Sequence, residues 1–126
     1  MAQTPKALKR HLEEYASVGY EEELRRALVP LADAFDAWRQ GTVASSEIAE
    51  RIHEFHQGPA RELYKLYWLA RDPRIAVARA IAVGALPREA VVPEAMEFLA
   101  ALIENFSQGP VDPGGTARPP GRGERR

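Results

Sequence analysis

Apolar residues between positions 24 and 38 recur at alternating steps of four and three. The stripe consists of Leu24, Leu28, Leu31, Phe35 and Trp38. This spacing places one side chain per turn on the same side of an α-helix, whereas a half-buried strand alternates every second residue. No segment of the sequence alternates in that way. The sequence therefore predicts an all-α protein, in which Trp38 closes the longest stripe and points into the core.

Glycine and proline divide the first part of this helical pattern. A first helix is expected to fade near Gly19, and three glutamates at 21–23 favour the start of a second, because acidic groups stabilise a helix N-terminus. Pro30 lies off the stripe and lacks a backbone donor, so we expect a kink or a break near residues 26–30. Gly41 is expected to end this helix as its C′ residue.

Similar signals predict the remaining helices. Ser45 or Ser46 is expected to cap a third helix, which the sequence QGP at 57–59 ends while starting a fourth. Asp72, followed by proline, is expected to cap a fifth. Pro87 begins a short turn, and a last helix is expected at about 93–106. The resulting prediction is a compact bundle of five to six helices.

Composition sets the limits of this bundle. The chain has 126 residues and no cysteine, which leaves room for one domain over residues 1–106 and excludes disulfides and thiolate metal sites. Residues 107–126 are rich in Pro, Gly and Arg without apolar anchors, and we expect a disordered tail. No apolar run is long enough for a membrane span. Abundant Arg and Ala suggest a bacterial protein, for which we expect a cytoplasmic location.

The charge distribution disfavours nucleic acid as a partner. The formal net charge is −1, and the tail holds four arginines, so the body of the protein is acidic. A helix-turn-helix remains an alternative, with the QGP sequence as its turn and with Arg61 and Lys65 on the exposed side of its second helix. Glu62 and the wide apolar arc of the same helix argue against that alternative.

Residues 36–47 resemble the calcium-binding loop of an EF-hand. Asp36 stands at position 1, Gly41 at position 6 and Glu47 at position 12. Trp38 occupies position 3, where an oxygen ligand is required. We therefore favour a helix–loop–helix corner over a calcium site.

A second candidate metal site follows the loop. Glu50, His53 and His56 lie on one flank of a predicted helix, with the Glu-x-x-His spacing that di-iron bundles use. Those bundles need a second Glu-x-x-His, which the sequence lacks, so a mononuclear metal site is the alternative left open. The sequence also lacks a nucleophile elbow and a phosphate-binding glycine loop. We therefore expect neither a cofactor nor an enzyme.

The predicted fourth and fifth helices carry more apolar surface than a small bundle needs. Residues 73–83 are apolar nearly all round, so this helix is expected to be central or covered by a partner. Large aromatic side chains are frequent at interface hot spots. We therefore predict a homodimer or a complex with a partner protein. The predicted surface contains Tyr64, Tyr67, Trp68 and Ile81, with Arg74 and Arg79 at its rim.

Overall fold

A computed structural model of the protein describes residues 6–69 and 72–107. Within these residues the chain forms four helices and no strand, which confirms the predicted all-α class. The predicted count of five to six helices is wrong, because two pairs of predicted helices are continuous. The predicted tail lies outside the described residues, apart from Ser107, which ends the last helix.

The first helix, α1 (Lys6–Arg39), runs without interruption through both predicted breaks. Gly19 does not end a helix. It lies within α1, at the point where this helix contacts Tyr67 and Ala80. A Cβ atom at Gly19 would lie 2.9 Å from the Cβ of Ala80 and 2.9 Å from the hydroxyl of Tyr67. Pro30 costs the helix one hydrogen bond, and packing against the next helix on both sides of Pro30 keeps the backbone helical.

The second helix is composite and replaces the predicted third and fourth helices. It consists of α2 (Ser45–Phe55), a π-helical turn η1 (His56–Ala60), α3 (Arg61–Tyr64) and a second π-helical turn η2 (Lys65–Leu69). The predicted break at 57–59 is wrong, because Gly58 does not adopt a positive φ and Pro59 lies within η1. A π-helical turn is wider than an α-helical one. The composite helix therefore passes Pro59 without a turn in the chain.

The loop between α1 and the composite helix is only partly as predicted. Gly41 has a φ of +82° and ends α1 in the predicted way. The predicted serine cap is wrong, because Ala44 holds the N-cap position and no side chain caps α2. The Ser45 hydroxyl instead accepts a hydrogen bond of 2.9 Å from Nε1 of Trp38.

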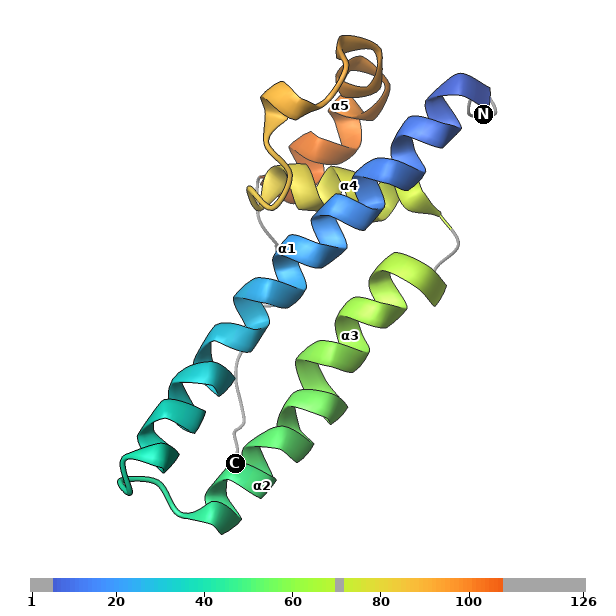
Figure 1. Ribbon diagram of the computed structural model, residues 1–126. Coiled ribbons are helices and arrows are strands. Elements are labelled where there is room, and N and C mark those ends of the chain that lie inside the picture. Colours follow the sequence, from blue (N-terminus) through green and yellow to red (C-terminus); the bar gives the residue numbers. More distant parts are fainter. Residues whose placement is uncertain (1–5, 70–71, 108–126) are drawn as a thin grey trace.

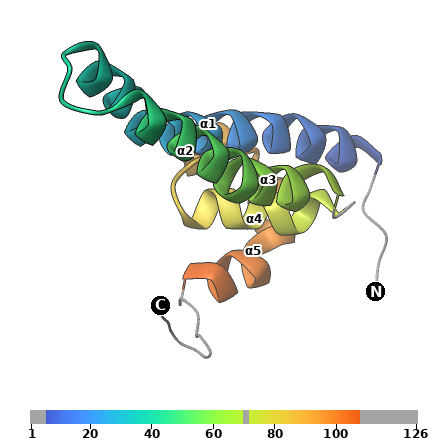
Figure 2. The ribbon, with the colours of Figure 1, turned by 90° about the horizontal axis from the view of Figure 1, so that it is seen from below.

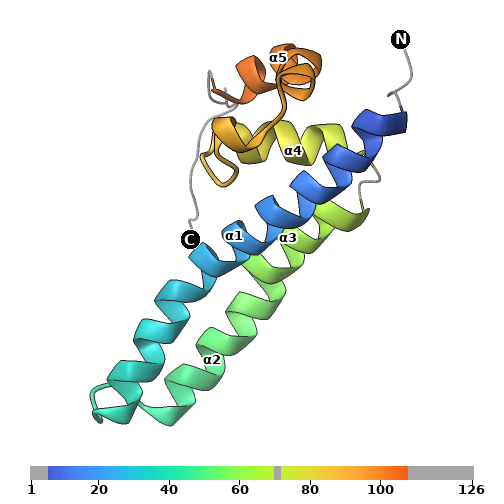
Figure 3. The same cartoon turned by 45° about the horizontal axis from the view of Figure 1, so that its top comes forward.

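Three layers make up the molecule. α1 and the composite helix form a long antiparallel hairpin (Figure 1). α4 (Pro73–Ala82) lies across one face of the base of this hairpin, and α5 (Pro93–Ser107) lies beyond α4 (Figure 2). A 3₁₀ turn, η3 (Arg88–Ala90), joins α4 to α5, as predicted. The outer half of the hairpin, residues 27–60, projects away from α4 and α5, and we call it the arm (Figure 3).

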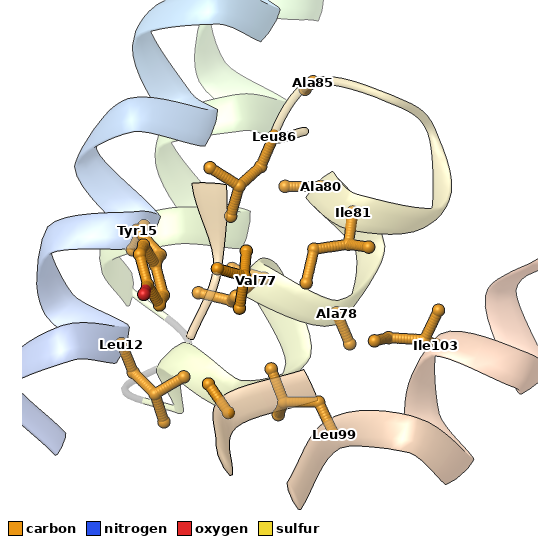
Figure 4. Close-up of a cluster of buried hydrophobic side chains, with 14 of the residues drawn as sticks. Leu12, Tyr15, Val77, Ala78, Ala80, Ile81, Ala85, Leu86, Leu99 and Ile103 are labelled. Atoms are coloured by element: carbon orange, nitrogen blue, oxygen red, sulfur yellow. The ribbon is translucent and has the colours of Figure 1, made fainter. Parts of the chain in front are cut away.

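The hydrophobic core surrounds α4. This helix is central, as its apolar composition predicted, because it packs against both α1 and α5. Leu12, Val77, Leu86 and Leu99 are the largest fully buried side chains, and they meet around α4 (Figure 4). The alanines of α4 let its neighbours approach closely. The core is therefore concentrated at one end of the molecule.

Two side chains of α1, Arg26 and Tyr15, hold the ends of the neighbouring segments by hydrogen bonds. Arg26 donates to the carbonyl oxygens of Val83 and Gly84, at 3.3 and 3.0 Å, and so satisfies the C-terminal end of α4. The Tyr15 hydroxyl accepts a bond of 2.9 Å from the backbone N–H of Val92, just before α5. Within the described residues, no helix is both long and apolar enough to cross a membrane.

Asp72 caps α4 as predicted, and its replacement by alanine is expected to lower the free energy of unfolding by about 1 kcal/mol. Its Oδ1 atom accepts a bond of 3.1 Å from the backbone N–H of Arg74. A hydrogen bond from the Arg74 guanidinium holds the pKa of Asp72 below its ordinary value. The contribution of Asp72 is therefore complete above the ordinary carboxyl pKa of about 4 and is lost as the pH falls below it.

Urea denaturation near neutral pH and at about pH 3 measures this effect. The difference between the Asp72→Ala variant and the wild type should shrink at the lower pH. Asp33→Ala is the control, because Asp33 is exposed and makes no ion pair within the described residues. An equal difference at both pH values would contradict the assigned role of the Asp72 carboxylate.

Candidate interaction surface

The structure separates the residues of the predicted interaction surface. Tyr67 and Ile81 are buried in the core, so neither lies on the molecular surface. Their burial follows from the position of α4, which turns Ile81 inward. Arg74 binds Asp72 of the same chain, at 2.9 Å. Only Tyr64 and Trp68 of the four predicted apolar residues are substantially exposed.

Arg79 belongs to a partly buried polar cluster. Its guanidinium donates a hydrogen bond to Oε2 of Glu23, and the Tyr67 hydroxyl donates to the same oxygen at 2.6 Å. Burial, together with the hydrogen bond to Glu23, raises the pKa of Tyr67 above its ordinary value. The phenol therefore stays protonated at neutral pH. The cluster joins α1, η2 and α4, and its groups satisfy one another.

Glu23 and Gly19 were not predicted from the sequence to be members of this contact. The two residues are four apart, on the side of α1 that faces α4, and Arg26 continues the same line. Gly19 leaves the space that the Tyr67 hydroxyl occupies next to Ala80. The available signal was a glycine and a glutamate one helical turn apart. That signal cannot be recognised without knowing that α1 is continuous.

The backbone of residues 36–47 does not form a calcium-binding loop. Asp36 lies within α1, so the first positions of the proposed loop are helical rather than curved around an ion. The Glu47 carboxylate binds Arg51, at 2.8 Å, one turn further along α2. Thr42 closes the corner by donating a hydrogen bond of 3.0 Å to the carbonyl oxygen of Ala37. The segment forms the helix–loop–helix corner that we favoured from the sequence.

The second candidate metal site lies on the outside of the arm. Glu50, His53 and His56 are all exposed, and His56 lies in η1. The described residues contain no group of three or more His, Cys, Asp or Glu side chains arranged to hold a metal ion. The turn predicted for the helix-turn-helix alternative is not formed, because the composite helix continues from α2 to the residues Arg61 and Lys65.

One face of the hairpin carries apolar side chains that nothing in the described chain covers. Trp68 contacts Tyr20, with ring centroids 5.4 Å apart, and Tyr64 precedes Trp68 by four residues on the same side of the helix. Tyr20 lies one turn before Leu24, and the stripe continues from Leu24 to Leu28 along α1. We call this the bare face. It consists of Leu28, Ile52, Tyr64 and Trp68, which are 40%, 44%, 50% and 39% exposed.

The bare face is turned away from α4. Gly19, Glu23 and Arg26 form the line of α1 that contacts α4 and the residues after it. Tyr20 lies about 100° further round the helix than Gly19. Figure 2 shows α4 and α5 on one side of the hairpin and no other element on the opposite side. Among the described residues, the hairpin therefore has one face that α4 and α5 cover and one face that no helix covers.

The arm has little core of its own. Among its residues only Ala34 and Ile48 are buried, although the predicted stripe of α1 runs along its whole length. Trp38 was predicted to be in the core, and this prediction is wrong. Its side chain is 40% exposed and packs edge-on against Phe35 at the tip. Two helices alone cannot enclose so wide a side chain.

The described surface also has open hollows, which are not lined by the residues of the bare face. One of about 490 Å³ lies between α1 and α5 beside His11, Glu94 and Glu97. Another of about 190 Å³ lies on the arm beside Pro30 and Arg51. Neither is lined by Glu23, Tyr67 or Arg79. The polar cluster of Glu23, Tyr67 and Arg79 therefore does not open into these hollows.

Comparison with known proteins adds no assignment to this geometry. The chain matches no protein-family model, no curated protein sequence and no solved structure. The bare face, the internal cluster and the hollows are thus the features from which a function has to be argued. Of these, the bare face is the one that an isolated molecule leaves unsatisfied.

Proposed function

We propose that this chain is a protein-interaction module without catalytic activity, and that its docking surface is the bare face. The observation that carries the proposal is the exposure of Leu28, Ile52, Tyr64 and Trp68 on one side of a two-helix hairpin. Contiguous exposed apolar groups are costly in water and commonly mark an interface. The surface predicted from the sequence is kept only in Tyr64 and Trp68.

The weak core of the arm supports the same proposal. A pair of helices that buries only Ala34 and Ile48 along its outer half gains little from tertiary packing. Isolated helices are marginal in water without such packing. A partner on the bare face would bury the outer sides of the stripes on both helices. The arm would then gain the packing that α4 provides at the base.

The chemistry of the internal cluster supports a non-enzymatic role. A general base or nucleophile must reach a substrate and exchange protons near neutral pH. Tyr67 is buried, its pKa is raised, and its hydroxyl is bound to Glu23. Arg79 occupies the same carboxylate oxygen. These groups are better suited to holding three helices together than to binding a substrate.

Site-specific photo-cross-linking in cells that naturally carry the gene tests this proposal. A benzophenone amino acid at position 28 or 52 is expected to give a cross-linked protein product, because the partner would lie directly over the bare face. Val29 is the matched control, because it is 45% exposed on the same helix but points about 100° away from Leu28. The absence of product at positions 28 and 52, or an equal yield at position 29, would refute the docking surface.

A further inference from the structure

We infer that the occupant of the bare face is a second copy of this chain, so that two hairpins pair into a four-helix bundle. The inference rests on the proposed function and names its partner. It predicts that the purified protein dimerises without any other component. The residues that carry it are those of the bare face.

The exposed area is sufficient for such a pair. Given the areas of large side chains, the four residues of the bare face expose about 350 Å² of apolar surface per copy. Interfaces are somewhat more than half apolar, so this corresponds to about 600 Å² of total surface per copy. Two copies would bury about 1,200 Å², which reaches the lower end of the range for specific interfaces. The half-buried Leu24 and Phe35 beside the bare face would add to this area.

The shape of the molecule permits the pairing. α4 and α5 both lie on the opposite side of the hairpin, so neither stands between two bare faces that approach each other (Figure 2). Each hairpin supplies two antiparallel helices, and four such helices with apolar inner sides are the ordinary content of a four-helix bundle. Leu28 and Ile52 would then change from edge residues of a two-helix layer to central residues of the bundle.

A two-fold axis along the arm would set α1 of one copy against α2 of the other. The same contacts then occur twice, as an isologous interface requires.

Sedimentation equilibrium of the purified full chain is the primary test. The wild type is expected to form a dimer with twice the 14.0 kDa mass of the chain, with a dissociation constant in the micromolar range. Leu28→Glu and Ile52→Glu should weaken dimerisation at least about tenfold, because each places a charge in the bundle interior twice. Val29→Glu should leave it unchanged, and circular dichroism should confirm that all three variants stay helical.

The results also distinguish this inference from the proposed function. A wild-type protein that remains a monomer at all soluble concentrations would overturn the second copy as occupant. If the photo-cross-link at position 28 then led to a different protein, the docking surface would stand with another partner. Unaltered dimers of Leu28→Glu and Ile52→Glu would show that the copies associate elsewhere, and this too would overturn the inference.

Discussion

Replacing Leu12 with alanine is expected to lower the free energy of unfolding by about 3 kcal/mol. Leu12 is fully buried between α1 and the core around α4, beside Val77 and Leu99 (Figure 4). The loss combines the transfer free energy of the removed methyl groups with a cavity that the close-packed neighbours cannot fill. Urea denaturation followed by circular dichroism measures the change.

Trp38→Ala is the informative comparison. The sequence predicts that Trp38 closes the core stripe, and removing a buried tryptophan costs about 3–5 kcal/mol. In the structure its ring is substantially exposed, and its main contacts are Phe35 and the Ser45 hydroxyl. We therefore expect a loss of about 1 kcal/mol, well below that of Leu12→Ala. A larger loss for Trp38→Ala than for Leu12→Ala would contradict the placement of the core at the base of the hairpin.

Replacing Glu23 with alanine is expected to lower the free energy of unfolding by about 2–3 kcal/mol. The substitution leaves the Arg79 guanidinium without its counter-charge and the buried Tyr67 hydroxyl without its acceptor. The Arg79 side chain is 32% exposed, so the expected loss is smaller than the roughly 3–5 kcal/mol that follows the breaking of a fully buried pair. Denaturant titration at neutral pH gives the value.

Two further variants distinguish the stability contributed by the cluster from the effect of removing any one charge from α1. Glu21→Ala removes an exposed glutamate of the same helix and should change the stability by less than about 0.5 kcal/mol. Adding Arg79→Met to Glu23→Ala should recover part of the loss, because the unpaired charge is then gone. A Glu23→Ala variant as stable as the wild type would mean that the cluster does not hold α1 to α4.

The candidate surface was only half predictable from the sequence. Tyr64 and Trp68 were named because aromatic side chains exceeded what one small core could absorb, and they are the exposed members of the predicted set. Tyr67 belongs to the same apolar arc but faces Gly19 and Glu23 across the hairpin. Leu28 belongs to the predicted stripe, whose spacing is that of inward-facing residues, yet its side chain is 40% exposed. Spacing indicates which residues share a side, but it does not indicate what covers that side.

The sequence by itself determined the local structure wherever a short-range interaction decides. Helical periodicity excluded strands, Asp72 and Pro73 began α4, and Gly41 ended α1 through a positive φ. The last helix was predicted within a residue of its observed end. Each of these features depends on hydrogen bonds or dihedral preferences within a few residues, which the local sequence specifies.

Only the tertiary structure decided which helices continue and which faces are covered. Gly19, Pro30 and Pro59 each disfavour a helix by about 1–3 kcal/mol, and packing along the hairpin and against α4 outweighs those costs. Coverage depends on where α4 lies, and that is set by contacts more than fifty residues apart, such as Glu23 with Arg79. Because α4 and α5 occupy one side of the hairpin, the same apolar stripes form a core at the base and an open face on the other side.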